Sequence, residues 1–234
     1  PQHIKDAAIA AINKGLTKYT AVGGTPGLKN AIVAKFKREN NFDFEAKQIL
    51  VSCGGKQSFF NLVLSVINPS DEVIIPAPYW VSYPDIVLIA EGNPVFINTG
   101  IEQNFKISAK QLEAAITPKT KMFVINSPSN PSGAVYTLDE LKALGEVLRK
   151  HPQILIATDD MYEHILLSNQ KFTNIVNACP DLFQQTVVLN GVSKAYSMTG
   201  WRIGYCGGPS HIITAMENIQ SQSTSNPSSI SQAA

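Results

Sequence analysis

The sequence predicts an α/β fold with three layers, α/β/α, around a mostly parallel sheet of about seven strands. Short apolar runs alternate along the chain with segments of helical periodicity. Most of these runs are continuously apolar rather than alternating, which is typical of strands buried on both faces of a parallel sheet.

The strand and helix expectations follow the chain in order. The predicted strands are Ile49–Cys53, Glu72–Pro76, Pro94–Asn98, Met122–Asn126, Ile154–Thr158, Thr186–Asn190 and Arg202–Cys206. The expected helices include Gly27–Asn40, Gln57–Ile67, Ser108–Ile116, Leu138–Lys150 and His211–Ser221. Thr25 before Pro26 is a good N-cap for the first helix, and Thr137 is one for the fourth. Because ligands of doubly wound sheets bind at the carboxyl ends of strands, the residues after each strand are the functional candidates.

Composition excludes several classes of protein. The chain has 234 residues and a formal net charge of +1, and it shows no basic stripe for nucleic acid. No apolar run is long enough to span a membrane. The three cysteines are odd in number and widely separated, so they match neither a disulfide framework nor a zinc site. We therefore expect a cytoplasmic protein with no metal, nucleic-acid or membrane partner.

Two candidates follow the first two predicted strands. Gly54, Gly55 and Lys56 open a helix, where backbone N–H groups and the helix dipole favour an anion. A purely structural strand–helix turn explains the glycines equally well. Trp80 follows two prolines after the second strand, and it is either a core residue or a stacking platform for a planar ring.

Polar residues also follow the fourth and fifth strands. Asn130 lies in a proline-rich turn that displays a donor and an acceptor, although the prolines alone explain the turn. Asp159 ends an apolar strand, where a carboxylate is costly unless it is paired. Asp160 is interpreted as a helix-start acid, and His164 as a structural histidine.

The strongest candidate follows the sixth strand. Lys194 is preceded by Ser193 and followed by small and apolar residues, with Arg202 eight positions later. Such a lysine is unusual on a solvated face. Partial burial and cationic neighbours would depress the pKa of its amine, as Schiff-base chemistry requires.

Six segments together resemble the fold-type I pyridoxal-phosphate (PLP) aminotransferases of class I/II, and most closely the bacterial aspartate aminotransferase branch. They are TKYTAVGGTPGLKNAI, VSCGGKQSFFNL, DEVIIPAPYWVSYP, NSPSNPSGAVY, TDDMYEHI and NGVSKAYSMTGWRIGY. The last is similar to the family's lysine signature and is highly specific.

The resemblance implies a role for each residue near the cofactor ring. Lys194 would be the catalytic residue that bonds covalently to PLP. Asp159 would pair with the pyridinium nitrogen, whose protonated form a buried carboxylate favours. Tyr162 and Asn130 would hydrogen-bond the phenolic oxygen, and Trp80 would stack on the ring.

The resemblance also assigns the cofactor phosphate and the substrate. Gly55, Lys56, Ser193 and Arg202 would hold the phosphate, and Tyr19 would reach that of the partner subunit in a homodimer. The substrate would contact Lys56, Trp80 and Asn130.

One position departs from the family pattern. Gly191 stands where many relatives have a phosphate-binding serine, which thins the phosphate site.

The resemblance implies amino transfer between an amino acid, aspartate or glutamate, and a 2-oxo acid. Residues 1–234 are expected to form the large PLP-binding domain, without the N-terminal arm and C-terminal small domain, and to be inactive alone. Arg38 and Arg149 are expected to be solvated, so neither is a candidate for the substrate α-carboxylate. Activity on prephenate or aromatic amino acids, PLP-dependent lyase or synthase chemistry, and a non-catalytic PLP-sensing regulator domain remain alternatives.

Overall fold

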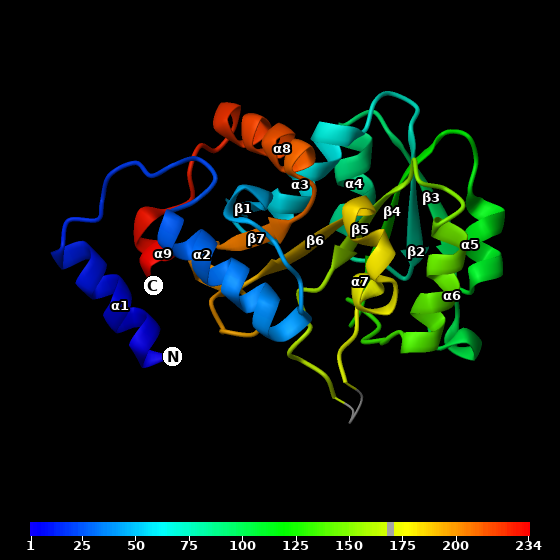
Figure 1. Ribbon diagram of the computed structural model, residues 1–234, viewed down its shortest axis with the longest axis horizontal. Coiled ribbons are helices and arrows are strands. Elements are labelled where there is room, and N and C mark those ends of the chain that lie inside the picture. Colours follow the sequence, from blue (N-terminus) through cyan, green and yellow to red (C-terminus); the bar gives the residue numbers. More distant parts are fainter. Residues whose placement is uncertain (168–170) are drawn as a thin grey trace. The chain divides into compact units, whose positions relative to one another are not determined.

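The computed structural model describes residues 1–167 and 171–234 (Figure 1). Its α-helices are α1 (Gln2–Asn13), α2 (Pro26–Lys35), α3 (Gly55–Val66), α4 (Ser82–Ile89), α5 (Ala109–Ala115), α6 (Leu138–Leu148), α7 (Ile175–Ala178), α8 (Ser210–Gln222) and α9 (Ser229–Ala233). Its strands are β1 (Ile49–Ser52), β2 (Glu72–Ala77), β3 (Asn93–Asn98), β4 (Thr120–Asn126), β5 (Leu155–Asp159), β6 (Thr186–Gly191) and β7 (Gly204–Gly207).

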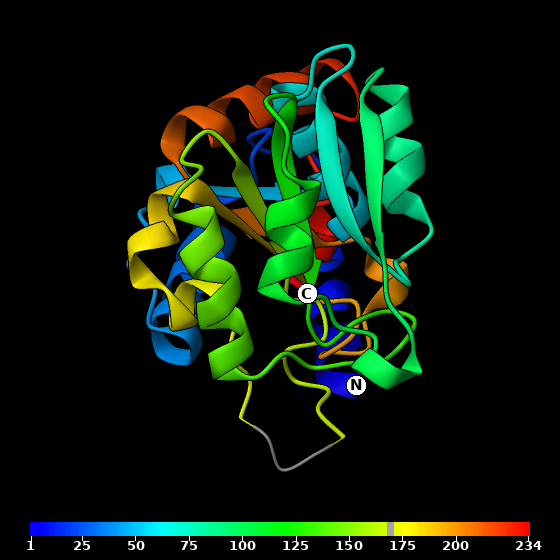
Figure 2. The same ribbon diagram turned by 90° about the vertical axis from the view of Figure 1, so that its right-hand side faces the viewer.

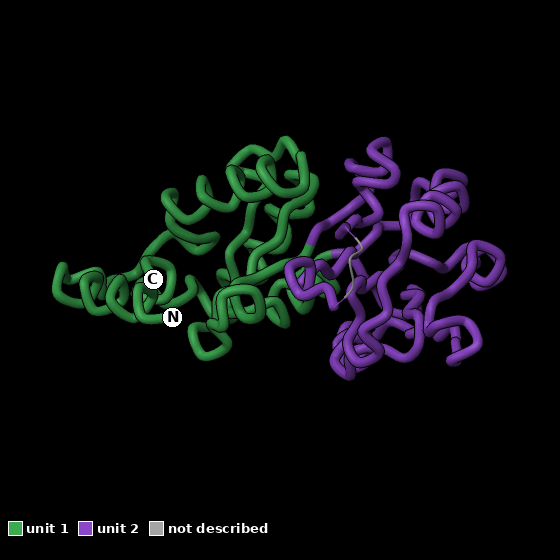
Figure 3. The backbone as a smooth tube through the Cα atoms, turned by 90° about the horizontal axis from the view of Figure 1, so that it is seen from below, with its two compact units in different colours: residues 1–65, 189–234 green, residues 66–188 purple. Residues whose placement is uncertain are grey.

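The predicted fold class is confirmed. The strands of the described residues form one seven-stranded sheet in the order β1-β7-β6-β5-β4-β2-β3. β2 pairs in parallel with β3 and β4, and β4 pairs in parallel with β5, whereas β1 and β7 are antiparallel. Each predicted strand is present, with bounds that differ by one or two residues. The chain divides into two compact units, residues 1–65 with 189–234 and residues 66–188 (Figure 3).

Unit 2, residues 66–188, has strands that are covered on both faces. In β2 the consecutive residues Val73, Ile74 and Ile75 are all fully buried. Neighbouring residues of a strand point to opposite faces, so this pattern requires cover on both. α4 packs on β2 and β3, α5 packs on β3, and α6 packs against α5 and α7 (Figure 2). This is the burial that continuous apolar runs predict.

Unit 1, residues 1–65 and 189–234, is built around β1 and β7. All four residues of β1 are buried, with α2 and α8 packed against the strand. The rings of Phe36, Phe42, Phe44 and Tyr205 form an aromatic cluster with centroid separations from 5.1 to 6.1 Å. The expected helix Gly27–Asn40 is present as α2, and its last turn, Phe36–Asn40, continues directly as a π-helix.

The predicted helix caps are present. The Thr25 hydroxyl accepts a hydrogen bond from Leu28 N at 3.4 Å, with Pro26 in the first turn. Thr137 forms a capping box with Glu140, which bonds two N–H groups at the start of α6. Within the described residues, no helix is both long and apolar enough to cross a membrane, and the three cysteines are free thiols.

Gly145 in α6 is a test of packing in unit 2. A Cβ added there would lie 2.2 Å from the Sγ atom of the buried Cys179. We expect Gly145→Ala to reduce the free energy of unfolding by about 1–3 kcal/mol, measured by denaturant titration. The double variant Gly145→Ala/Cys179→Ala should recover much of the loss. Gly27→Ala is the control, since a Cβ at Gly27 meets nothing within 4 Å; an equal loss there would contradict the packing explanation.

Candidate functional site

The ends of β4 and β5 in unit 2 bring several predicted polar residues together. Asn126 and Asp159 are paired in the parallel register, so both lie at the same edge of the sheet. The Asn126 side chain donates to the Asp159 carbonyl oxygen at 2.8 Å and accepts from Asn130 N at 2.8 Å. Asn126 therefore fixes the turn that carries Asn130 to the strand end that carries Asp159.

The Asp159 carboxylate is held by two donors. The Tyr83 hydroxyl donates to Oδ2 at 2.6 Å, and Met161 N donates to Oδ1 at 3.2 Å. Burial raises the pKa of the Asp159 carboxyl, and the bonds from Tyr83 and Met161 N oppose that rise. A carboxylate oxygen that accepts one hydrogen bond keeps a lone pair for a further N–H or cation. The carboxylate is thus oriented and still able to bind a positive group.

Tyr83 is a functional candidate that the sequence analysis missed. Its ring is buried, and burial and the neighbouring Asp159 raise the pKa of its hydroxyl well above the ordinary value. It therefore acts as a neutral donor. The indole of Trp80 packs edge-on against Tyr83, with ring centroids 5.3 Å apart and an interplanar angle of 85°. Trp80 is half-buried, so part of its surface remains accessible to a ligand.

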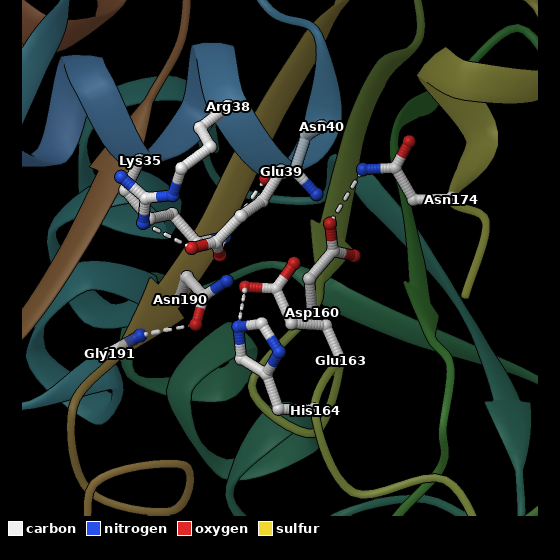
Figure 4. A network of polar contacts seen from close by, with 10 residues as sticks. All are labelled: Lys35, Arg38, Glu39, Asn40, Asp160, Glu163, His164, Asn174, Asn190 and Gly191. Atoms are coloured by element: carbon white, nitrogen blue, oxygen red, sulfur yellow. Dashed lines mark hydrogen bonds and ion pairs between the residues drawn. The ribbon is translucent and has the colours of Figure 1, made fainter. Parts of the chain in front are cut away.

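Asp160 is not the helix-start acid that the sequence suggested. It is buried in a turn, where Oδ1 accepts from the Thr158 hydroxyl at 2.7 Å and Oδ2 accepts from Asn174 Nδ2 at 2.6 Å (Figure 4). Burial raises the pKa of this carboxyl to about 7. The partners come from β5 and from the N-cap of α7, and residues 161–164 form a turn, so no helix begins at Asp160. Tyr162 is half-buried in the same turn.

In unit 1 the antiparallel pair β1 and β7 brings Gly54 to Arg202. Ser52 is registered with Gly204, so the loop after β1 lies beside the residues before β7. A Cβ on Gly54 would lie 2.2 Å from Arg202 Nη2, and one on Gly204 would lie 2.2 Å from Gly55 N. Gly204 requires glycine because a Cβ there would meet backbone atoms, and Gly54 requires it because its φ is +92°. The guanidinium and the start of α3 form a concentration of positive charge and N–H groups.

The loop after β6 carries Ser193 and Lys194 in the same unit. Val192 N donates to Ile203 O at 3.2 Å, which holds this loop beside the residue that follows Arg202. Ser193 is buried, whereas Lys194 is one of the exposed residues of this loop. The reason is local: residues 194–197 form a turn that leaves the sheet. The turn is closed by hydrogen bonds from Ser197 N and Met198 N to the carbonyls of Lys194 and Ser193.

The remaining predicted residues of unit 1 lie outside the sheet or at its end. Lys56 lies exposed in the first turn of α3, and Tyr19, in the loop between α1 and α2, is 91% exposed. The amide of Gly191, at the end of β6, donates to the Asn190 side chain at 2.7 Å. At this position, where many relatives have serine, the buried N–H of Gly191 therefore already has a hydrogen-bond partner.

The family profile for aminotransferase class I and II matches residues 1–234. The chain belongs to this family. It is 77% identical over its whole length to an aspartate/prephenate aminotransferase of Nitrosomonas europaea, and it spans 59% of that protein. Members of the family use PLP. The resemblance that the motifs indicated is therefore confirmed at the level of the family, while the chain spans less than two thirds of this relative.

Solved aminotransferase structures share the fold. The aspartate aminotransferase of Rhizobium meliloti is similar with a TM-score of 0.98 and 53% identity, covering all of this chain and 58% of that one. A Thermus thermophilus aspartate aminotransferase with maleate is similar with a TM-score of 0.94 and 42% identity, covering all of this chain and 60% of that one. Both support the assignment of the sheet to this family's fold.

The bond from Tyr83 to Asp159 predicts a measurable shift. Tyr83→Phe removes a donor that stabilises the ionised carboxylate, so the pKa of Asp159, already raised by burial, should rise further. The carboxyl carbon chemical shift of Asp159 followed against pH measures it, assigned with Asp159→Asn. Tyr79→Phe is the control, since Tyr79 stacks on Phe96 instead. An unchanged titration in Tyr83→Phe would refute the role of the hydroxyl.

Proposed function

We propose that this chain forms the large PLP-binding domain of an aminotransferase that transfers an amino group between aspartate or glutamate and a 2-oxo acid. The observation that carries the proposal is the Asp159 carboxylate, oriented by two donors at the end of β5 in a chain that belongs to the aminotransferase family. A fixed carboxylate favours the protonated form of a pyridine nitrogen.

The residues present suit PLP. Unit 1 offers the phosphate a backbone approach at Gly54 and Gly55, the Arg202 guanidinium and the buried Ser193. A Cβ at Gly54 would occupy the space that Arg202 uses, so the glycine keeps this region compact. Lysine, arginine and helix N–H groups are the usual ligands of phosphate.

Unit 2 offers groups that suit the ring. Asp159 would pair with the ring nitrogen, Tyr162 and Asn130 would hydrogen-bond the phenolic oxygen, and Trp80 would stack on the ring face. The Tyr83 ring packs edge-on against the Trp80 indole and so restricts its orientation, and the Tyr83 hydroxyl also donates to Asp159. One tyrosine thus supports both the stacking and the charge partner.

PLP, when bound, supplies an electron sink for charge that develops on the substrate α-carbon. Lys194 Nζ would hold the cofactor covalently and would serve as the base that accepts the substrate α-proton. Asp159 would keep a proton on the ring nitrogen throughout. Lys194 lies in the exposed turn at residues 194–197, so its amine is accessible to a ligand.

Lys56 is proposed to bind the distal carboxylate of the substrate. Its position in the first turn of α3 lets its backbone N–H serve the phosphate while its exposed side chain is directed elsewhere. The Thermus thermophilus enzyme was solved with maleate, a dicarboxylate, which supports this substrate class. The Nitrosomonas relative is an aspartate/prephenate aminotransferase, which supports prephenate as a second substrate.

We propose a homodimer in which Tyr19 reaches the partner subunit's cofactor phosphate. Tyr19 is 91% exposed, and Ile9 and Ile12 of α1 and Leu16, just after that helix, are each about half exposed. Large apolar side chains left open at one end of a unit favour a protein partner. The free thiols are compatible with a reducing, cytoplasmic location.

The covalent role of Lys194 is testable in the full-length protein. Borohydride reduction of the PLP-loaded protein should attach the cofactor irreversibly, and peptide mapping should find it on Lys194. Lys194→Ala should abolish the attachment and the transamination, while Lys56→Ala should leave the attachment unchanged. A label on any other lysine would show that the assignment is wrong.

The role of Lys56 is testable by substrate dependence. Loss of the charged partner of the substrate's second carboxylate should cost about 2–4 kcal/mol with dicarboxylic substrates and little with neutral ones. We expect Lys56→Ala to lower kcat/KM for aspartate and glutamate by this amount, and for alanine or phenylalanine far less, at nearly unchanged PLP affinity. Lys47→Ala, at an exposed lysine paired with Glu45, is the control. Equal losses for all substrates would instead assign Lys56 to the phosphate.

A further inference from the structure

The loop that carries Tyr19 is held by a side chain from the far end of the sequence. Gln232 of α9 accepts from Thr25 N at 2.7 Å through Oε1. Its Nε2 donates to the Thr20 hydroxyl at 3.1 Å and to Pro227 O at 2.8 Å. Gln232 therefore bonds the residue next to Tyr19, the N-cap of α2 and its own helix start at once.

Two side chains of α8 hold the same loop closer to α2. Gln220, fully buried, donates through Nε2 to Val22 O and Val51 O, both at 2.8 Å. Glu217 accepts from Gly23 N through Oε1 at 3.1 Å. Residues 14–25 have little regular structure of their own, so these bonds specify the conformation of the loop.

The start of the loop is tied to α9 as well. The Ser229 hydroxyl donates to Leu16 O at 2.7 Å, and α1 packs against α9. Both flanks of Tyr19 are thus fixed, while the tyrosine itself is 91% exposed. A well-anchored loop that presents one exposed aromatic residue is a preorganised contact, since the ordering entropy is already lost before binding.

We propose that Gln232 is a positioning residue for catalysis: it fixes the loop so that the Tyr19 hydroxyl meets the cofactor phosphate of the partner subunit. This inference rests on the proposed function, because it needs the dimer and the bound cofactor. Gln232 acts through Tyr19 and touches no cofactor itself. Among the side chains that anchor the loop, we assign this role to Gln232 because it hydrogen-bonds Thr20, the immediate neighbour of Tyr19.

A double-mutant cycle in the full-length dimer tests the inference. PLP is titrated into apoprotein of wild type, Gln232→Ala, Tyr19→Phe and the double variant, and the visible absorbance gives the Kd. We expect Gln232→Ala to weaken PLP binding about three- to tenfold, as loss of one or two hydrogen bonds would. The double variant should bind no more weakly than Tyr19→Phe, because the two residues act in series.

Three controls separate positioning from general destabilisation. Pyridoxal, which lacks the phosphate, should bind wild type and Gln232→Ala equally. Gln222→Ala, at an exposed glutamine of α8, should behave as wild type. Gln232→Glu keeps an acceptor for Thr25 N and should lose less affinity than Gln232→Ala.

The outcomes are decisive in each direction. Additive losses in the cycle, or an equal loss with pyridoxal, would overturn the inference and leave Gln232 a structural residue, with the proposed function intact. A Tyr19→Phe variant with wild-type PLP affinity would overturn the proposed cross-subunit contact itself. Should Gln232→Ala fail to fold, Thr20→Val removes the bond from Gln232 Nε2 together with the local bond from the Thr20 hydroxyl to Ala21 O. It should give the same phosphate-dependent loss; wild-type affinity there would overturn the inference.

Discussion

The end of β5 imposes the strongest constraint on unit 2, because an apolar strand delivers a carboxylate to a position with little water. Ionised Asp159 is tolerable there only with donors on both oxygens, and Tyr83 and Met161 N supply them. The carboxylate of the next residue, Asp160, is also buried, and it accepts hydrogen bonds from Thr158 and Asn174. The geometry of the turn after β5, including Tyr162, follows from satisfying two adjacent acids.

A steric constraint plays the corresponding part in unit 1. The antiparallel register of β1 and β7 places two backbone segments so close that Gly204 admits no Cβ, and Gly54 beside it has a φ of +92°, which favours glycine. The same closeness sets the Arg202 guanidinium against the start of α3. A charge that would otherwise be solvated becomes part of a site for an anion, because glycine lets the chains approach.

Much of this could be predicted from the sequence because it depends on local signals. Continuous apolar runs marked the strands, and Thr25 and Thr137 marked helix starts. The failures have physical reasons. Asp160 was misread because its partner Asn174 is fourteen residues away in sequence. Tyr83 and Gln232 were missed because their roles consist of long-range hydrogen bonds, which leave no pattern in a single sequence.

The long-range bonds also explain why distant parts of the sequence belong to one unit. Residues 14–25 have few contacts that their own composition would specify, and the side chains that order them come from α8 and α9, about 200 positions later. Each bond alone is worth about 1 kcal/mol, too little to order a loop. Acting together on neighbouring backbone groups, they restrict the loop to one conformation, since the entropy lost to the first bond need not be lost again to the next. An exposed tyrosine at the centre of such a loop therefore has a defined position even before any partner is bound.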